Sequence, residues 1–371
     1  MYDTGIIGGG LAGLTAAIHL TQQNKRVIVF EKQAYPHHKV CGEYVSNEIV
    51  PYLKCLDIAI ANGVDIDTLH FSTQKGNSIA TKLPLGGFGM SRFALDELLY
   101  KKAVDLKVTF VFEAVRSVVF KEDSFDIETD SGLVVSSKTA IGAYGKRSHL
   151  DKKLERNFMA KKSSWLGVKA HYQHPDFQDN VVALHNFKGG YGGLSKTETG
   201  AVNFCYLVHY ETFKELKDIE RFNESIVSEN PFLKEFLAEA RPVFEQALSI
   251  AQISFEKKEA VTNHVLMCGD TAGLIHPLCG NGMAMAIHSA KIASELLCSY
   301  LEDPNIDRNS LETAYKKQWK DAFGYRLWIG RKLQWILLHD TLANLVMGIV
   351  SKSPKLLRFL IKQTHGKPIK C

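Results

Sequence analysis

The chain has 371 residues, and its 45% hydrophobic and 23% charged content is typical of a globular protein rather than a disordered or fibrous one. Residues 313–371 hold 12 basic and 2 acidic side chains, a net charge of +10, so the overall +5 leaves −5 on the first 312 residues. This uneven charge, without a nucleic-acid recognition motif, argues against a nucleic-acid partner.

Targeting signals and cysteine spacing indicate where the protein works. No apolar run approaches the roughly 20 residues of a membrane-spanning helix, and the N-terminus has no signal-peptide pattern. The seven cysteines are odd in number, irregularly spaced and without a CxxC pair. This pattern favours neither a disulfide framework nor a zinc site. We therefore expect no metal and a reducing, cytoplasmic setting.

The first 31 residues predict a nucleotide-binding strand–helix–strand unit. Residues 4–8 read as a short apolar strand, 14–20 as a helix with small residues, and 27–30 as a second apolar strand. The turn between the first strand and the helix has GxGxxG spacing. Its glycines are Gly8, Gly10 and Gly13.

Each residue of this motif has a role in holding a dinucleotide. Gly8 permits a tight turn, and Gly13 lets the helix pack closely on the strand. Gly10 lets the backbone approach a pyrophosphate at the helix N-terminus, in a first turn that includes Ala12. Glu31 is placed to bind an adenosine ribose, and its charge disfavours the 2′-phosphate of NADP. The alternative is a glycine-rich turn with no ligand.

The middle of the chain predicts two groups of strands. Three strands of the first group form a meander around a turn at 130–132. The second group indicates a β-rich domain that is followed by a helical stretch at 211–240. The predicted strands are 108–112, 115–120, 124–129 and 133–140, then 164–172, 181–187 and 202–208.

A second cofactor motif lies far downstream, where a strand at 264–268 is followed by Asp270 and then by Gly280 and Gly282 at a helix start. Asp270 suits a ribityl hydroxyl, and the glycines open a helix N-terminus whose dipole stabilises negative charge on a reduced flavin. A NAD dehydrogenase has no need of a second motif, whereas FAD is long and its ring must be held separately. The pair of motifs therefore indicates FAD.

These motifs together resemble the FAD-dependent monooxygenase and oxidoreductase superfamily with the p-hydroxybenzoate hydroxylase-type fold. Within it, Lys39-Val-Cys41-Gly42-Glu43 is similar to the geranylgeranyl reductase-like branch. The resemblance implies an α/β fold with a Rossmann-like FAD-binding domain, a β-sheet substrate domain and a helical C-terminal cap. We expect the FAD-binding domain over residues 1–158 and 256–312, the substrate domain over 159–255, and the cap over 313–371.

The resemblance also implies roles for individual residues. Cys41 and Gly42 would contact FAD, with Cys41 near the flavin ring. Arg92, from the segment Ser91–Leu99, would contact FAD as well, and the backbone near Val115 would reach the adenine. The flavin-ring loop has the pattern PxxGxG followed by methionine, and its residues are Pro277, Gly280, Gly282 and Met283.

Three features depart from relatives within the superfamily. Tyr144 stands where hydroxylases have the aspartate of GADGxxS, which weakens the case for their mode of NADPH docking. The stretch around Tyr191 lacks the tryptophan, phenylalanine and proline of the prenyl reductase YxWxFP segment. The WxWxIP segment of flavin halogenases is absent, so halogenation is not expected.

Three regions keep two or more interpretations. Cys41 has a functional interpretation, in which it tunes the flavin or delivers a proton. In the alternative it is only a small packed residue. Tyr191 either lines the substrate cavity, which would make it a catalytic candidate with Cys41, or belongs to a hairpin rich in glycine. The basic, apolar C-terminal region either contacts a membrane surface, covers an apolar substrate tunnel, or packs as a plain helical cap.

The predicted function is an FAD-dependent oxidoreductase acting on an apolar small molecule that is aromatic, polyketide-like or lipid. Family resemblance favours a monooxygenase that acts through a flavin C4a-hydroperoxide. A double-bond reductase of the geranylgeranyl reductase type is the alternative, and a non-catalytic flavin-fold binding protein is a third. NAD(P)H is expected at most as a transient electron donor, and a redox partner is the other source of electrons.

Overall fold

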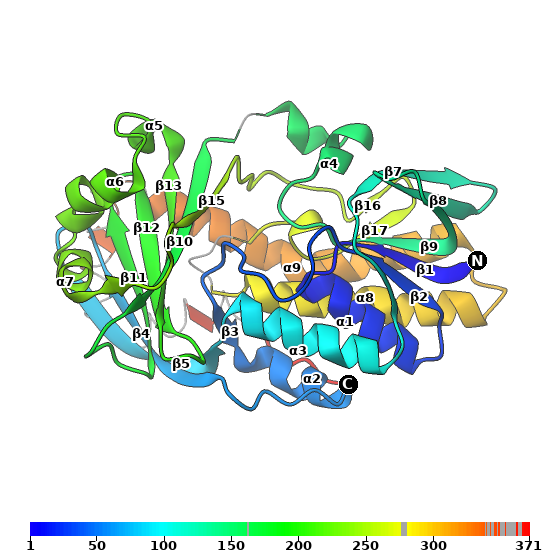
Figure 1. The fold of residues 1–371 in the computed structure, drawn as a ribbon, viewed down its shortest axis with the longest axis horizontal. Coiled ribbons are helices and arrows are strands. Elements are labelled where there is room, and N and C mark those ends of the chain that lie inside the picture. Colours follow the sequence, from blue (N-terminus) through cyan, green and yellow to red (C-terminus); the bar gives the residue numbers. More distant parts are fainter. Residues whose placement is uncertain are drawn as a thin grey trace.

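Two β-sheets lie at opposite ends of an elongated molecule and are connected by helices (Figure 1). A computed structural model describes residues 1–161, 163–275 and 280–337, together with 339, 342, 345–346, 348, 353, 361–362 and 366–371. Among these residues, no helix is both long and apolar enough to cross a membrane.

The first sheet has the order β16-β17-β9-β1-β2-β6, and β8 pairs with β9 and β7. Strands β17, β9, β1, β2 and β6 run parallel, as the predicted strand–helix–strand unit requires. The strands are β1 (Tyr2–Ile7), β2 (Val27–Phe30), β6 (Thr109–Val111), β7 (Val115–Lys121), β8 (Ser124–Thr129), β9 (Val134–Gly142), β16 (Val261–Thr262) and β17 (Val265–Met267).

The second sheet has the order β14-β10-β13-β12-β11-β4-β5-β3, and β15 pairs with β10. Its pairs are antiparallel except for β11 with β4. The strands are β3 (Tyr44–Ser46), β4 (Val64–Ser72), β5 (Ser78–Gly89), β10 (Trp165–Gln173), β11 (Val181–Phe187), β12 (Gly190–Lys196), β13 (Val202–His209), β14 (Arg241–Pro242) and β15 (Leu248–Ala251).

Residues 44–89 differ from the predicted division of the chain. That division placed all of 1–158 with the FAD-binding domain, but β3, β4 and β5 pair within the second sheet. The hydrophobic pattern does not reveal β5, because Pro84 and several glycines interrupt it and much of its first half is exposed. The second sheet is therefore assembled from two separate parts of the chain.

The helices pack on both sheets. Helix α8 packs on both α1 and α9, and α3 packs on α1, whereas α5, α6 and α7 gather at the second sheet (Figure 1). The helices are α1 (Leu11–Gln22), α2 (Val50–Cys55), α3 (Arg92–Asp105), α4 (His149–Lys153), α5 (Tyr210–Phe213), α6 (Ile219–Ser225), α7 (Pro231–Glu239), α8 (Gly282–Glu302) and α9 (Arg308–Leu337). Short 3-10 helices are η1 (Asn47–Ile49), η2 (Asn157–Ala160), η3 (Val227–Glu229) and η4 (Gly269–Thr271).

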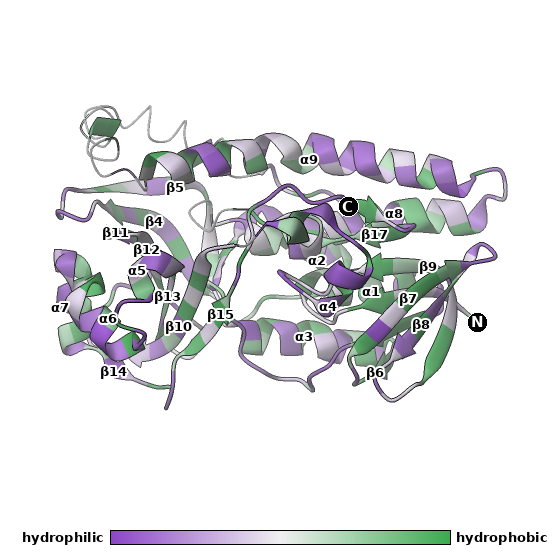
Figure 2. Cartoon of the chain, turned by 90° about the horizontal axis from the view of Figure 1, so that it is seen from above, coloured by the Kyte–Doolittle hydropathy of each residue, from purple (hydrophilic) through white to green (hydrophobic). Residues whose placement is uncertain are grey.

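Helix α9 forms the described start of the C-terminal cap. It begins at Arg308, five residues before the predicted boundary at 313, and runs unbroken for 30 residues. Figure 2 shows it along one long edge of the molecule, outside α8. Pro354, which would interrupt a helix, lies outside the described residues.

The C-terminus returns to the start of the second sheet. Cys371 forms a disulfide with Cys55 at the end of α2, with the two Cα atoms 5.9 Å apart. The Ile369 N–H donates a hydrogen bond of 2.7 Å to the Glu48 carbonyl. The sequence predicted no disulfide framework, and this single disulfide was not foreseen because 316 residues separate two cysteines whose spacing carries no signal.

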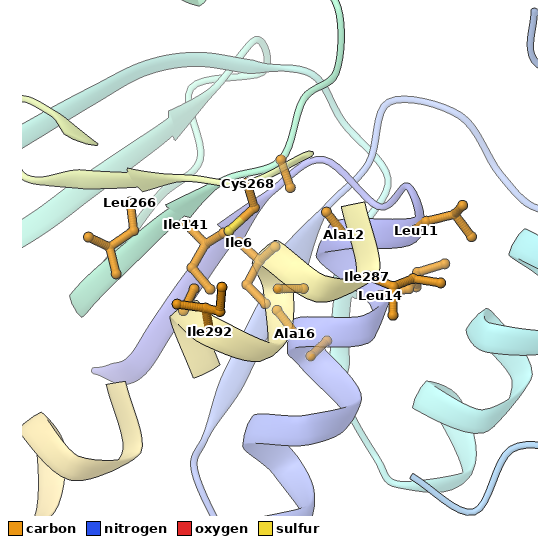
Figure 3. Packing of buried hydrophobic residues seen from close by; sticks show 14 of the residues in the cluster. Ile6, Leu11, Ala12, Leu14, Ala16, Ile141, Leu266, Cys268, Ile287 and Ile292 are labelled. Atoms are coloured by element: carbon orange, nitrogen blue, oxygen red, sulfur yellow. The ribbon is translucent and has the colours of Figure 1, made fainter. Parts of the chain in front are cut away.

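The largest apolar core fills the space between α1, the first sheet and α8 (Figure 3). Ile6 of β1 and Leu14 of α1 are fully buried there, as is Ile287 of α8. Small residues such as Ala16 let α1 lie close to the sheet. This packing fixes the N-termini of α1 and α8 at the same side of the sheet, where the site lies.

Candidate active site

The turn from β1 into α1 has the backbone that the GxGxxG motif predicts. Gly8 has a φ of +103°, a region that favours glycine, and its N–H donates to the Phe30 carbonyl over 2.8 Å. A Cβ on Gly13 would overlap the Gly8 carbonyl oxygen, so any side chain there would push helix and strand apart. Both glycines therefore serve the turn and the packing of helix on strand, as the motif predicts.

Gly10 opens onto a positively charged cradle. It precedes α1 without a side-chain cap, so backbone N–H groups at the helix start lack side-chain acceptors. Of the described residues, a Cβ on Gly10 would meet within 4 Å only Arg92 Nη2 at 3.5 Å and Lys39 Nζ at 3.9 Å. The open space, the helix N-terminus and the two cations fit a pyrophosphate group.

Asp96 keeps these two cations in place. The Arg92 guanidinium donates two hydrogen bonds of 2.7 Å to its carboxylate, and Lys39 Nζ donates one of 2.9 Å. Burial raises the pKa of Asp96, but the charges of Arg92 and Lys39 outweigh it and hold that pKa below its usual value. One carboxylate balances two cations, so a net positive charge faces the α1 N-terminus.

Glu31 lies where the motif predicts, directly after β2. The Gly9 N–H donates to its Oε2 over 2.9 Å and the Gln33 N–H to its Oε1 over 3.2 Å. These bonds fix the carboxylate beside the glycine turn, and the ribose contact stays a prediction. Val115 is buried at the start of β7, and its backbone contact with adenine also stays a prediction.

The second motif brings a second helix N-terminus to the same place. Gly280 has a φ of +59°, and a Cβ there would lie 3.0 Å from the Tyr44 ring. Gly282 and Met283 begin α8, whose first turn has no side-chain cap and no acidic residue. Asp270 lies in η4 at the end of β17. Pro277 lies outside the described residues.

One cavity joins the two motifs to the second sheet. Its first wall consists of the cofactor motifs, and its second wall consists mainly of apolar side chains from the second sheet. The predicted residues Gly8, Gly13, Glu31 and Val115 are not in its lining. The predicted residues that line it are Gly10, Ala12, Cys41, Gly42, Arg92, Tyr191, Asp270, Gly280, Gly282 and Met283.

The Cys41–Gly42 loop crosses from one wall to the other. Asn203 Nδ2 donates to the Cys41 carbonyl over 3.1 Å, and Ser195 Oγ donates to the Gly42 carbonyl over 3.4 Å. Both donors come from the second sheet, so that sheet positions the loop. Tyr191 of β12 is buried and lines the same cavity.

Cys205 of β13 also lines the cavity and was not predicted as a site residue. Burial raises the pKa of its thiol to about 12, so it stays protonated near neutral pH. The sequence offers no signal that singles it out, because it is one of two cysteines within predicted strands.

Glu43, next to the Cys41–Gly42 loop, is the centre of a buried ion network. Its Oε1 accepts from the Arg92 N–H at 2.7 Å and from Lys169 Nζ at 2.5 Å, and its Oε2 lies 2.7 Å from His171 Nε2. Burial raises the pKa of Glu43, but His171 and Lys169 outweigh it and hold that pKa below its usual value. Lys169 and His171 were missed, although their alternation within an apolar strand pattern is a usable signal.

A metal ion at this network is not assigned. His38, Glu43 and His171 each place a ligand atom within 4.8 Å of the others, among the described residues. The Lys169 ammonium and the Arg92 N–H already occupy one Glu43 oxygen. A cation placed at the other oxygen would be repelled by that ammonium, so we interpret the group as an ion-pair network.

Two side chains that are not in the cavity lining support the first wall from behind. Lys258 is buried and donates hydrogen bonds to the carbonyls of Lys146 and Asp270, over 3.0 and 2.8 Å. Burial lowers the pKa of Lys258 to about 8. The Tyr144 hydroxyl donates to Asp151 over 3.1 Å, so the residue that replaces the hydroxylase aspartate is committed to the protein interior.

This combination of a parallel nucleotide-binding sheet, two helix N-termini and an apolar cavity defines an FAD-binding oxidoreductase fold. Residues 6–38 match the family model of the NAD(P)-binding Rossmann-like domain.

Curated relatives align with most of the chain. Conditioned medium factor receptor 1 of Dictyostelium discoideum is 23% identical, over 88% of this chain and 68% of its own. Digeranylgeranylglycerophospholipid reductase 2 of Methanothermobacter thermautotrophicus is 24% identical, over 91% of this chain and 88% of its own. Menaquinone reductase of Mycobacterium tuberculosis is 22% identical, over 97% of this chain and 90% of its own.

Solved structures share the whole fold. A flavin-dependent brominase has a TM-score of 0.81 and 18% identity, covering 100% of this chain and 94% of its own. A geranylgeranyl bacteriochlorophyll reductase-like protein of Thermoplasma acidophilum has a TM-score of 0.76 and 19% identity, covering 98% and 99%. A probable FAD-dependent monooxygenase of Pseudomonas aeruginosa has a TM-score of 0.71 and 16% identity, covering 92% and 98%.

The sequence and the fold are similar to those of FAD-dependent oxidoreductases, and the homologues include geranylgeranyl reductase-like proteins. The predicted fold class is confirmed, and the fold implies FAD as the cofactor. This similarity supports an enzyme rather than a non-catalytic binding protein.

Proposed function

We propose that the protein is a flavin-dependent reductase that adds two hydrogens across a carbon–carbon double bond of an apolar substrate. The observation that carries this proposal is the cavity, in which the cofactor cradle faces an apolar wall and Cys41 lies where the two walls meet. The relatives whose names describe a lipid reductase and a menaquinone reductase support the choice.

The residues of the first wall would hold FAD. The α1 N-terminus with Gly10, Arg92 and Lys39 would bind the pyrophosphate, and Glu31 the ribose. The α8 N-terminus would face the flavin ring, where its dipole stabilises negative charge. When bound and reduced, FAD supplies the hydride for the substrate.

Cys41 is the proposed proton donor. Its Sγ–H bond breaks as the proton moves to the carbon next to the one that takes the hydride, and the thiolate recovers a proton from water. The loop bonds from Asn203 and Ser195 hold Cys41 at the boundary of the two walls. The apolar residues of the second wall orient the chain of the substrate and exclude water from it.

Electrons reach the cofactor, in this proposal, from NAD(P)H that binds transiently or from a protein redox partner. Anaerobic rapid-mixing measurements with NADH and with NADPH would test the first source. Bleaching of the oxidised flavin spectrum by either nucleotide would support it, and no reaction with both would favour the redox partner.

The reaction itself is tested by anaerobic turnover. Photoreduced protein is mixed with a geranylgeranyl glycerolipid or with menaquinone, and products are analysed by mass spectrometry. We expect a product that has gained two hydrogens, and Cys41→Ser should slow its formation roughly 100-fold or more. Cys298→Ser, which removes another free cysteine, is the matched control. Turnover that requires dioxygen would overturn the proposal.

A monooxygenase is the second candidate. Walls that exclude water also suit insertion of an oxygen atom, and the probable monooxygenase of similar fold favours this choice. One oxygen atom of dioxygen would enter the substrate and the other would leave as water, at the expense of two electrons from the donor. In the same turnover experiment the product would then contain one added oxygen atom, and it would form only under air.

A further inference from the structure

The outer face of α9 carries large aromatic side chains that are open to solvent. Tyr325, Trp328 and Trp335 are 58, 51 and 57% exposed. Together with Lys332 they follow the spacing of three and four residues that places side chains on one face of a helix. We call this surface, Tyr325, Trp328, Arg331, Lys332 and Trp335, the α9 patch.

The opposite face of α9 explains why the patch is not needed for folding. Tyr315, Trp319, Phe323 and Leu327 point into the core and are buried. They pack the helix against the rest of the molecule, and Trp319 reaches the chain at Gly273, just before the flavin-ring loop. One face of the helix is therefore packed in the core, and the other, which carries the α9 patch, is exposed. Figure 2 shows the helix along one long edge of the molecule.

The charge around the patch is mainly positive, since Asp321, one turn before Tyr325, is paired with Lys317 over 3.1 Å. Residues 322–337 contain three basic residues and no acidic one. Arg326 is directed inward, 3.6 Å from Glu48, so Arg331 and Lys332 are the two exposed cations. Trp328, Arg331, Lys332 and Trp335 border a shallow groove, and Lys332 Nζ lies 6.0 Å from the Trp328 ring.

This chemistry selects one kind of partner. Tryptophan and tyrosine prefer the boundary between water and lipid, and lysine or arginine beside them is attracted to anionic headgroups. In a symmetric pair of copies, Arg331 and Lys332 would lie close to the same two cations of the other copy, which disfavours a second copy of the chain as the partner. We propose that the α9 patch docks the protein on an anionic lipid surface.

The position of α9 gives this docking a use. Its buried face contacts the segment that leads into the cavity, and Ile361 of the same C-terminal region lines that cavity. A protein held on lipid by α9 has its apolar cavity close to a source of apolar molecules. The inference goes beyond the proposed reaction, because binding to lipid is measured without turnover.

Vesicle binding tests the inference with the full chain in its FAD-loaded form. Vesicles of phosphatidylcholine alone are compared with vesicles that also contain phosphatidylglycerol, by co-sedimentation and by tryptophan fluorescence. We expect binding and a blue shift with the anionic vesicles only, weakened by added salt. No binding of the wild-type protein to anionic vesicles at low salt would overturn the proposal.

Paired variants distinguish binding through the α9 patch from nonspecific binding through charge or exposed aromatic side chains elsewhere. Trp328→Ala/Trp335→Ala and Arg331→Gln/Lys332→Gln should each weaken anionic-vesicle binding roughly tenfold or more. The matched controls, Tyr210→Ala and Lys101→Gln/Lys121→Gln, change exposed residues elsewhere and should bind as the wild type does.

Two results with these variants would contradict the proposal. One is equal vesicle binding by the patch variants and the wild type. The other is a concentration-dependent dimer, measured by light scattering, that disappears in the tryptophan variant, because this would assign the face to a second copy. Circular dichroism confirms that every variant compared is folded.

Discussion

The two walls of the cavity are built in different ways. The first wall is largely backbone: glycine turns and two helix N-termini, completed by Arg92 and Lys39. The second wall is made of side chains from strands that are far apart in the sequence, and it reaches the first through the Glu43 network. The first wall suits a cofactor of fixed shape, whereas the second can change with the substrate.

The largest effect is expected where the second wall meets the first. Lys169→Met leaves the Glu43 carboxylate buried without its cation, which should lower the free energy of unfolding by about 3–5 kcal/mol at neutral pH. In the wild type the pKa of Glu43 lies below 4.5, so its charged form stabilises the fold above pH 4.5 and this contribution is lost as the pH falls below that value; the difference between the two proteins should therefore shrink there. Urea unfolding at several pH values measures the loss of unfolding free energy and its dependence on pH.

A double variant is the control for this effect. Glu43→Gln/Lys169→Met removes the charge pair together and should recover much of the stability that Lys169→Met loses. A loss of less than about 1 kcal/mol in the single variant would mean that the pair behaves as an exposed one does.

Lys258 tests the first wall through pH. Its pKa is about 8 in the folded protein against 10.5 in the unfolded chain, so the unfolded chain binds more protons between these values. The wild type should therefore gain stability, relative to Lys258→Met, as the pH rises from 8 to 10.5, by roughly 3 kcal/mol in all. A difference between the two proteins that does not vary over this range would contradict the buried, depressed lysine.

A smaller effect is expected at the glycine turn of the first wall. Gly13→Ala places a Cβ against the Gly8 carbonyl and should cost about 2–3 kcal/mol, with loss of bound FAD. Gly324→Ala, another helical glycine, meets only the flexible Lys320 side chain at 3.5 Å and should stabilise slightly. Thermal unfolding of the two variants compares their stabilities, and fluorescence measures the release of flavin from each.

The same contrast explains what the sequence could predict. The first wall depends on residues close together in sequence, so its glycine spacing and the acid at Glu31 predict strand, turn and helix without knowledge of the rest. Each of the two cofactor motifs is local in this sense, whereas the tertiary fold brings Gly10 and Met283 to one cavity.

The second wall could not be predicted in the same way. Lys169 reaches Glu43, and Cys205 reaches the cavity, only through the pairing of β10 with β13, which hydrophobic periodicity does not specify. The strands at 64–89 escaped detection because proline and glycine interrupt the pattern of β5. The disulfide joins residues 316 positions apart and depends on the path of the whole chain.

The claim that the first wall binds FAD and the second wall binds the substrate is tested most directly by the dissociation constant of FAD. This constant is measured by fluorescence titration of the cofactor-free protein. Arg92→Ala removes a charged donor from the first wall and should weaken FAD binding roughly 10- to 100-fold. Leu184→Ala enlarges the cavity at its second wall. It should leave the dissociation constant of FAD unchanged, while it alters the substrates that are accepted. Equal weakening of FAD binding by the two variants, or none by Arg92→Ala, would contradict the assignment of the cofactor to the first wall.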